Sequence, residues 1–146
     1  LRNADVLIAG DMVTDAAGTG YAEASSIWAT SSGGKVITRT YLGSILYVNN
    51  SDPSTLIRAY NGTNVAFSLT GTSYFNRPAP MASTWGDNLT VYKDSVGGGA
   101  AAYSGTMGTG NLGIGATNTG SEQWNGTIRE VKIFDSELTA EEVGDL

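Results

Sequence analysis

Turn-forming residues divide this sequence into short segments, and their spacing limits what the chain can fold into. From Tyr21 onward, segments rich in β-branched and aromatic residues alternate with clusters of Gly, Asn, Asp and Ser. The turn signals recur at intervals of about 8–12 residues, which is the spacing of antiparallel strands in a sandwich or barrel. Gly, Ser, Thr and Asn are abundant, whereas Lys and Glu, which favour helices, are few. The sequence therefore predicts an all-β fold.

The Asn61-Gly62 pair marks the clearest expected hairpin, between strands at 55–60 and 64–69. Asn-Gly supplies the positive φ angles of a two-residue type I′ turn. In the second strand, alternate residues from Val65 to Leu69 are apolar, and this period of two indicates one buried face. Further strands are expected at 35–41, 44–48, 81–85 and 89–93, with a short buried strand at 112–115 inside the loop-rich stretch 97–120.

The last expected strand, 127–134, contains an irregularity. Ile128 differs in parity from Val131 and Ile133, so a regular strand would place them on opposite faces. One extra residue near Arg129-Glu130 would bring all three apolar side chains to one face. The sequence therefore predicts a β-bulge at this point.

A short helix is expected to close the chain. Thr139 suits the N-cap position, and Glu142, three residues later, completes a capping box. Glu141 lies in the first turn, where the positive end of the helix dipole favours a carboxylate.

The chain is expected to hold one domain, at residues 21–146. Residues 1–20 are weakly patterned, acidic and rich in turn-forming residues, among them Gly18 and Gly20. We expect them to form an N-terminal arm or linker that packs on a neighbouring subunit. Because the first residue is Leu rather than Met, the sequence is expected to be a trimmed or processed piece of a longer protein.

Two residue types missing from the sequence, Cys and His, exclude several kinds of chemistry. Without Cys, the chain has no disulfide and no thiolate zinc site. Without His, it cannot contain a Ser-His-Asp or Cys-His catalytic arrangement. The net charge of −6 argues against nucleic acid as a partner, because nucleic-acid binding relies on clustered Lys and Arg. No apolar run reaches the roughly 18 residues of a membrane span, so no membrane insertion is expected.

The C-terminal part of the chain resembles a known family of domains. The segments 112–115, 126–134 and 138–143 read LGIG, GTIREVKIF and LTAEEV. They are similar to the closing strands and terminal helix of the laminin-G-like / concanavalin A-like lectin jelly-roll superfamily. The preceding segment, 82–94, is similar to the hairpin that comes before them, but Ser95 stands where the family usually has Gly.

This resemblance covers residues 81–143 most specifically and implies a two-sheet antiparallel jelly-roll sandwich with a short C-terminal helix. Many relatives also bind carbohydrate at an edge of the sandwich that is formed by loops, and in some of them this edge holds calcium. The stretch 57–64, IRAYNGTN, is closest in style to domains of tailed-bacteriophage virion proteins. A shared fold does not by itself assign a function to this chain.

The sequence argues against catalysis. Glucanases of this fold use paired carboxylates in an E-x-D-x-x-E pattern along one strand, because a retaining glycosidase needs two carboxyl groups about 5 Å apart. That pattern is absent here, and the polysaccharide lyases of the fold rely on His and Tyr. We therefore predict that the chain is not an enzyme.

Candidate sugar-binding residues lie in and beside the glycine-rich loops. Trp124 and Tyr103 could offer aromatic faces to a sugar, with the amides of Gln123 and Asn125 for its hydroxyl groups. The alternative is that Trp124 fills the core at the entrance to the last strand, because large aromatic side chains are usually buried. Trp85, at the end of an expected strand, is predicted to be a core residue.

Calcium is the candidate cofactor, and it would need clustered oxygen ligands. Asp87, Asn88 and Asp94 could supply some of them, as could Asp11 and Asp15. None of these residues belongs to a complete calcium-loop motif, and turn capping explains most of them.

These observations favour a non-catalytic protein at a virion surface or in an extracellular setting. The leading hypothesis is a capsid-decoration or tail-associated module that binds host-surface glycans, with other virion subunits or copies of itself as partners. One alternative is a purely structural decorating or cementing protein with no ligand. Another is a carbohydrate-binding or adhesion module of a secreted bacterial protein.

Overall fold

We describe the protein from a computed structural model of its 146 residues. No helix among the described residues has the length and apolar character that a membrane span requires. The structure describes residues 7–10, 12–26, 35–40, 43–48, 57–63, 65–67, 77–105, 107–108, 110–116, 123–124 and 126–146.

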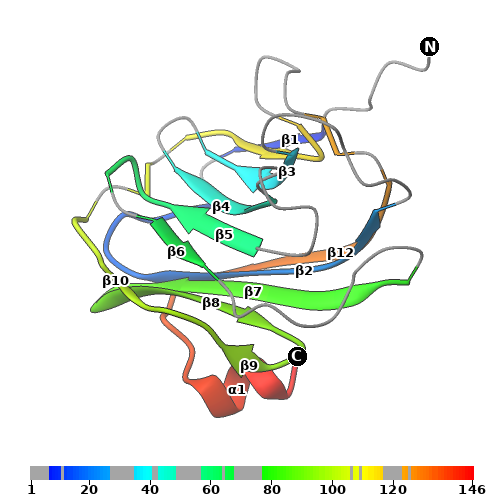
Figure 1. The fold of residues 1–146 in the computed structure, drawn as a ribbon. Coiled ribbons are helices and arrows are strands. Elements are labelled where there is room, and N and C mark those ends of the chain that lie inside the picture. Colours follow the sequence, from blue (N-terminus) through cyan, green and yellow to red (C-terminus); the bar gives the residue numbers. More distant parts are fainter. Residues whose placement is uncertain are drawn as a thin grey trace.

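Two antiparallel sheets pack face to face, which confirms the predicted two-sheet jelly-roll sandwich (Figure 1). The strands expected at 35–41 and 44–48 are β3 (Lys35–Arg39) and β4 (Ser44–Val48), which form an antiparallel pair. Those expected at 81–85 and 89–93 are β7 (Ala79–Trp85) and β8 (Asn88–Lys93), which also pair. Sheet I contains, in spatial order, β1 (Leu7–Ala9), β11 (Leu112–Ile114), β3 (Lys35–Arg39), β4 (Ser44–Val48), β5 (Ile57–Tyr60) and β6 (Val65–Phe67). Sheet II contains β10 (Ala101–Ala102), β8 (Asn88–Lys93), β7 (Ala79–Trp85), β2 (Gly18–Ser26) and β12 (Gly126–Phe134), with β9 (Val96–Gly97) paired to β8.

Apolar side chains at alternate strand positions fill the space between the sheets. In β5, Ile57 and Ala59 are fully buried in this core, whereas Arg58 and Tyr60 alternate with them and are half-buried. Trp85 is fully buried in the same core, as predicted. The outward residues of a strand are therefore identified by the core residues on either side of them.

The predicted hairpin at Asn61-Gly62 is confirmed, but its type I′ turn is wrong. β5 and β6 pair with Tyr60 opposite Val65, so the connection between them is four residues long rather than two. Gly62 has a positive φ of 89°, but Asn61 does not. Instead, Asn61 is buried and its Oδ1 accepts a hydrogen bond from Thr63 N at 3.1 Å. A side-chain turn, rather than two positive φ angles, reverses the chain here.

The predicted bulge in β12 is confirmed. The register of β12 against β2 shifts between Ile128 and Glu130, which leaves Arg129 as the extra residue. As a result, Ile128, Val131 and Ile133 all pack against the core between the sheets.

The predicted capping box is also confirmed, at the start of α1 (Ala140–Gly144). Thr139 Oγ1 accepts a hydrogen bond from Glu142 N at 3.3 Å, and the Glu142 carboxylate accepts one from Thr139 N at 2.8 Å. The Glu142 carboxylate also accepts a hydrogen bond from Thr139 Oγ1 at 2.8 Å. The two bonds from Thr139 N and Thr139 Oγ1 favour the charged form of the carboxylate, so the pKa of Glu142 is lowered.

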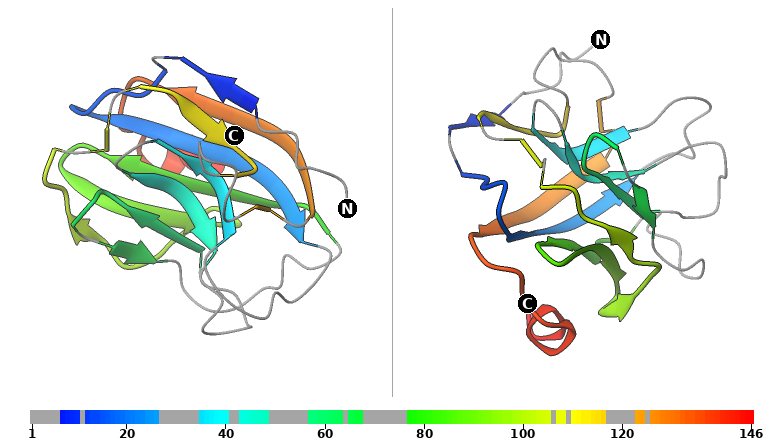
Figure 2. Two further views of the ribbon diagram at one scale, coloured as in Figure 1. Left: turned by 90° about the horizontal axis from the view of Figure 1, so that it is seen from above. Right: turned by 90° about the vertical axis from the view of Figure 1, so that its left-hand side faces the viewer.

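The helix α1 covers part of the outer face of sheet II (Figure 2). Val143 of α1 is buried against Tyr21, Ala82 and Tyr92, which form a second, smaller hydrophobic cluster outside the sandwich. Sheet II is therefore packed on both of its faces.

The predicted boundary at residue 20 is wrong for the part of the arm that the structure describes. β1 pairs with β11 in sheet I, and β2 begins at Gly18 in sheet II. The sequence suggested a turn at Gly18 and Gly20, but both glycines lie inside a strand. A Cβ atom at these positions would clash with Trp85 and Ile45, respectively, so the glycines allow these core side chains to approach β2.

The residue that departs from the family pattern, Ser95, lies in a tight turn. β8 and β9 pair with Lys93 opposite Val96, so Asp94 and Ser95 form a two-residue turn. Their φ angles are 48° and 64°, which are the positive values of a type I′ turn. The turn that a glycine usually favours is therefore made here by two residues with side chains.

Candidate functional site

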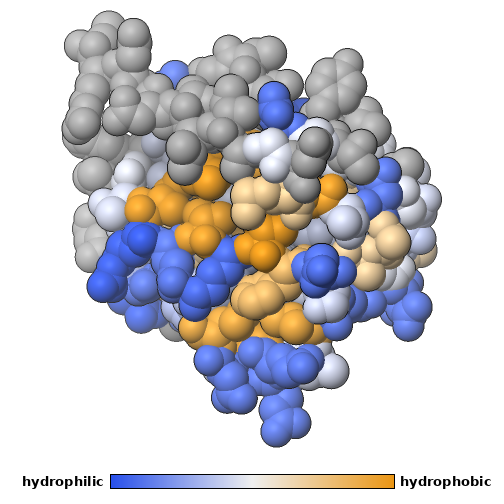
Figure 3. Space-filling view, turned by 180° about the vertical axis from the view of Figure 1, so that it is seen from behind, coloured by the Kyte–Doolittle hydropathy of each residue, from blue (hydrophilic) through white to orange (hydrophobic). Residues whose placement is uncertain are grey.

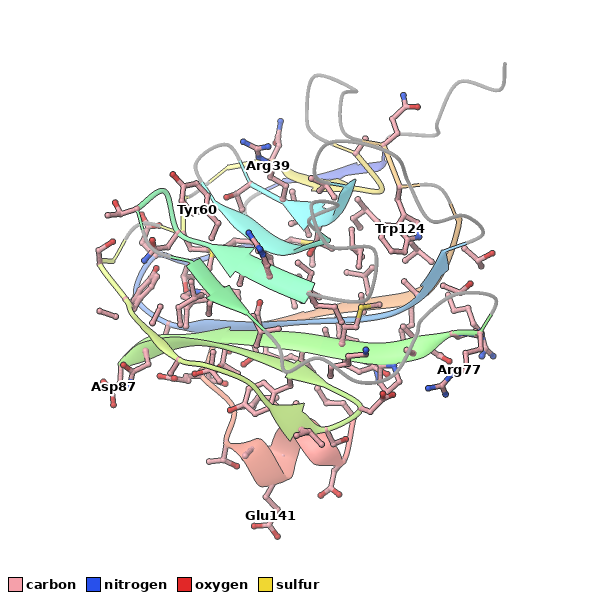
Figure 4. The ribbon with its side chains drawn as sticks, viewed as in Figure 1. Arg39, Tyr60, Arg77, Asp87, Trp124 and Glu141 are labelled. Atoms are coloured by element: carbon pink, nitrogen blue, oxygen red, sulfur yellow. The ribbon has the colours of Figure 1, made fainter. Side chains whose placement is uncertain are left out.

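The three residues predicted to bind calcium lie at opposite ends of β8. Asp87 and Asn88 lie at its start, and Asp94 follows its end. A strand of this length spans about 20 Å, whereas calcium ligands lie about 2.3–2.6 Å from the ion. Figure 4 shows Asp87 far from Arg77, which pairs with Asp94 at 4.0 Å. The predicted ligand set of Asp87, Asn88 and Asp94 is therefore wrong.

The other acidic residue proposed for calcium, Asp15, has a structural contact. Its Oδ1 accepts a hydrogen bond from Gly108 N at 2.5 Å, and Asp11 lies outside the described residues. Within the described ranges, no group of three Asp or Glu side chains could hold a metal ion. The described part of the chain therefore gives no support to a calcium site.

Trp124 is a core residue. Its side chain is 9% exposed and belongs to the hydrophobic cluster between the sheets. Its backbone N donates a hydrogen bond to Gly115 O at 2.7 Å. Of the two roles considered for Trp124, filling the core fits this burial. Gln123 beside it is half-buried, and Asn125 lies outside the described residues.

Tyr103, the other predicted aromatic of the sugar platform, lies at the opposite end of sheet II from Trp124. Tyr103 follows β10, which pairs with the start of β8. Trp124 precedes Gly126, which pairs with Ser26 at the far end of β2. The structure therefore does not bring Trp124 and Tyr103 together as one platform.

The Tyr103 hydroxyl instead joins two loops. It donates a hydrogen bond to Asp15 O at 2.5 Å and accepts one from Met107 N at 3.0 Å. Burial raises the pKa of Tyr103; the hydrogen bond from Met107 opposes this rise, and the nearby Asp15 charge adds to it. The hydroxyl is therefore held as a neutral donor between the N-terminal segment and the loop after β10.

A different set of polar side chains gathers on the outer face of sheet I. We call it the arginine face and define it by Arg39, Arg58 and Tyr60. Arg58 and Tyr60 point away from the core because Ile57 and Ala59 point into it. Figure 4 shows Arg39 and Tyr60 on the side of sheet I that is turned away from sheet II.

The strand register places these residues close together. Arg39 on β3 is opposite Ser44 on β4, and Ser44 is opposite Tyr60 on β5. With strands about 4.8 Å apart, the Cα atoms of Arg39 and Tyr60 are separated by about 10 Å. Arg58 is two residues from Tyr60 on the same strand, about 7 Å away along it. The three residues therefore share one patch of the sheet.

Charge is divided unequally between the two sheets. The strands of sheet I contain the basic residues Lys35, Arg39 and Arg58 and no acidic residue. Apart from Asp15, the described acidic residues belong to sheet II, its turns and the C-terminal segment: Glu23, Asp87, Asp94, Glu130, Asp135, Glu137, Glu141, Glu142 and Asp145. The net charge of the chain is −6, yet the strands of sheet I contain basic residues and no acidic ones.

Arg58 has an unsatisfied polar atom. Its Nε is buried and has no hydrogen-bond partner. No carboxylate among the described residues pairs with its guanidinium group. Burying part of a charged group without a partner opposes folding, so this arrangement needs a reason.

Sequence reasoning missed the arginine face. The signal was the alternation in 57–60, IRAY, which puts Arg58 and Tyr60 together on one face of the strand. The position of Arg39 beside them depends on strand pairing, which no local pattern encodes.

Two carboxylates face each other across neighbouring strands of sheet II, as a catalytic pair would. Glu23 on β2 and Glu130 on β12 are cross-strand partners on the outer face. Each is already bound to a cation: Glu23 to Arg129 at 2.9 Å and Glu130 to Lys132 at 3.3 Å. Both lie beside the edge of the sheet, and this arrangement is that of a surface ion-pair network.

A second surface lies along β12, the edge strand of sheet II. Figure 3 looks at the molecule from behind and shows exposed apolar surface in the middle of this side. Ile128, Val131 and Ile133 of β12 are only partly buried. The bulge and the charged residues Arg129 and Lys132 are features that discourage edge-to-edge pairing of strands.

Sequence comparison identifies the family. A model of the concanavalin A-like lectin/glucanases superfamily matches residues 16–144. The chain belongs to this superfamily. The matched range begins before residue 21 and so agrees with the structure in placing the start of β2 inside the domain. A search of curated proteins found no match.

Solved structures share the superfamily fold at low sequence identity. A heptameric SAP-like pentraxin from Limulus polyphemus has a TM-score of 0.67 and 15% identity, over 99% of this chain and 82% of the pentraxin. A candidate carbohydrate-binding protein from Bacteroides ovatus has a TM-score of 0.74 and 13% identity, over 97% of this chain and 44% of that protein. A sialidase from Trypanosoma rangeli has a TM-score of 0.64 and 13% identity, over 89% of this chain and 22% of the sialidase. At these identities the similarity concerns the fold alone.

Proposed function

We propose that this superfamily domain is a non-catalytic carbohydrate-binding module whose ligand binds on the arginine face. The observation that carries the proposal is the grouping of Arg39, Arg58 and Tyr60 on the outer face of sheet I. Guanidinium groups donate several hydrogen bonds in a fixed geometry, which suits sugar hydroxyl and acidic groups. An aromatic ring beside them adds an apolar contact, a common combination in ligand sites.

The other face of the sandwich is less suited to a ligand. The outer face of sheet II is partly covered by α1, and its charged residues Glu23, Arg129, Glu130 and Lys132 are paired with one another. The fold family and the Bacteroides ovatus relative support a carbohydrate as the ligand. The absence of His from the sequence and the ion pairs at Glu23 and Glu130 support a binding role rather than catalysis.

The proposed setting is a virion surface or an extracellular surface, where the module would bind host or environmental glycans. The support for a virion setting is the resemblance of the segment 57–64 to domains of tailed-bacteriophage virion proteins. Copies of this chain or other surface subunits would be its partners. Electron microscopy of particles labelled with an antibody to this domain would test the setting, and a label found only on the producing cell would contradict a virion role.

A second candidate function is a purely structural role in an assembly. The apolar surface along β12, with the partly buried Ile128, Val131 and Ile133, favours it because such surface is stabilised when a neighbour covers it. In that case the protein would bind no glycan, and it would form an oligomer or join a particle through the apolar side chains of β12 rather than through pairing of its strand edge.

A glycan array probed with and without a calcium chelator tests the leading function. The proposal expects binding in both conditions, because arginine and tyrosine side chains rather than a metal ion recognise the sugar. No binding above background in either condition would contradict it and favour the structural role. Release of reducing sugar from bound polysaccharides would contradict the absence of catalysis.

A further inference from the structure

We infer that the arginine face selects acidic saccharides, that is, glycans carrying carboxylate or sulfate groups. The inference rests on the proposed function and adds the chemical class of the ligand. It follows from two observations, the distribution of charge between the sheets and the state of Arg58.

The charge distribution favours an anionic ligand on sheet I. The strands of this sheet contain basic residues and no acidic ones, whereas the acidic residues that the structure describes lie mostly in sheet II and near α1. An acidic glycan would be repelled by the carboxylates on the α1 side, whereas on the strands of sheet I it would meet arginines and no carboxylate. Such complementarity orients a ligand before contact and increases its association rate.

Arg58 indicates where the acidic group binds. Its guanidinium has no carboxylate partner among the described residues, and its buried Nε lacks a hydrogen bond. The buried Nε has almost no exposed surface, so a ligand would contact the terminal nitrogens of the guanidinium, which can bind a carboxylate or sulfate through two parallel hydrogen bonds. A ligand anion at this position would give the guanidinium the charged partner that the described part of the chain does not supply.

Arg39 extends the site to a second acidic group. By strand spacing its Cα lies about 12 Å from that of Arg58, with Tyr60 on the same face. Two acidic groups on one saccharide chain can then contact two arginines, and the second contact forms at high effective concentration. Binding is therefore expected to increase with saccharide length.

Matched pairs of ligands and variants test the inference. The ligands are oligogalacturonate against a neutral galactose oligomer of equal length, and dextran sulfate against dextran. The variants are Arg58→Gln and, as a control for net charge, Arg129→Gln on sheet II, whose side chain is 58% exposed and ion-paired with Glu23. Isothermal titration calorimetry measures affinity, and thermal unfolding of each variant checks the fold.

The wild type is expected to bind at least one acidic ligand 10-fold or more tightly than its neutral partner. Arg58→Gln should lose 10-fold or more of this affinity, and Arg129→Gln should stay within 2-fold. Arg58→Lys, which keeps the charge but not the paired hydrogen bonds, should bind with intermediate affinity. Removing an unpaired, half-buried charge should also raise the Tm of Arg58→Gln, on the order of 2–4 °C. Whether oligogalacturonate or dextran sulfate binds more tightly identifies the source of the charge.

Several results would overturn the inference. Equal losses in Arg58→Gln and Arg129→Gln would show a general charge effect, and so would equally tight binding of single-stranded DNA. Binding of neutral saccharides alone would overturn the acidic specificity but leave the proposed function intact. Binding of no saccharide at all would overturn both.

Discussion

Ser83 and Ile45 connect the two sheets through the core. Ser83 Oγ on β7 donates a hydrogen bond to Ile45 O on β4 at 2.8 Å, and both residues are fully buried. The pairing of β4 with both neighbouring strands is irregular, with register shifts on each side. The Ser83 hydroxyl thus binds a backbone carbonyl of an irregular strand, and it ties sheet I, which carries the arginine face, to sheet II.

Ser83→Ala is expected to destabilise the protein by about 1–3 kcal/mol, because it leaves the buried Ile45 carbonyl without this donor. Urea unfolding followed by tryptophan fluorescence measures the change. Ser136→Ala, at an exposed position, is the control and should change stability by less than about 0.5 kcal/mol. Equal stability of the two variants would show that the bond across the core contributes nothing.

Gly20→Ala is expected to destabilise the protein by about 1–3 kcal/mol, because the new Cβ would clash with Ile45 Cγ2 in a packed core. Adding Ile45→Ala should recover part of the loss caused by the glycine substitution, so a double-mutant cycle should show coupling between the two sites. Gly10→Ala is the control, since its Cβ would lie 3.8 Å from Asn111 Oδ1. Additive effects in the cycle would contradict the close approach.

Ser95→Gly is expected to stabilise the protein by about 1 kcal/mol. Ser95 has a φ of 64°, and a residue with a Cβ is strained in this region whereas glycine is not. The denaturation midpoint should therefore rise. Ala100→Gly, where φ is not positive, should lower it. A fall in the midpoint with Ser95→Gly would indicate that the Ser95 side chain matters more than the strain.

Tyr103→Phe is expected to change the response to alkaline pH. Because the folded-state pKa of Tyr103 is raised, its contribution to stability is fully present below the unfolded value of about 10 and is lost as pH rises through the folded value. At neutral pH the variant should have a lower Tm, since two hydrogen bonds are lost. The difference in Tm between wild type and variant should shrink above pH 10. A difference in Tm that stays constant to pH 11 would contradict the claim that burial raises the pKa of Tyr103.

Features set by local sequence were predictable. The bulge at Arg129 follows from the parity of Ile128, Val131 and Ile133 in one strand, and the capping box follows from the spacing of Thr139 and Glu142. In the bulge, the period of the strand fixes the face on which each side chain lies. In the capping box, the interacting residues are only three positions apart in the sequence. The all-β class followed from the spacing of strands and turns, and the two-sheet architecture followed from the resemblance to the laminin-G-like / concanavalin A-like superfamily.

Features set by packing between distant segments were not predictable. The sequence suggested a turn at Gly18 and Gly20 because nothing in the local pattern shows that Trp85 and Ile45 press against them. Asp87 and Asp94 seemed close along the chain, but the strand between them holds them apart. The position of Arg39 beside Tyr60 depends on the register of three strands, and this contact defines the candidate site.

The central claim, that ligand binds on the outer face of sheet I, is tested most directly by NMR mapping. ¹⁵N–¹H spectra of the labelled protein would be recorded during titration with oligogalacturonate. The account predicts that shift changes gather in β3, β4 and β5 around Arg39, Arg58 and Tyr60. Changes that gather around α1 or along β12, or no change at saturating saccharide, would contradict it.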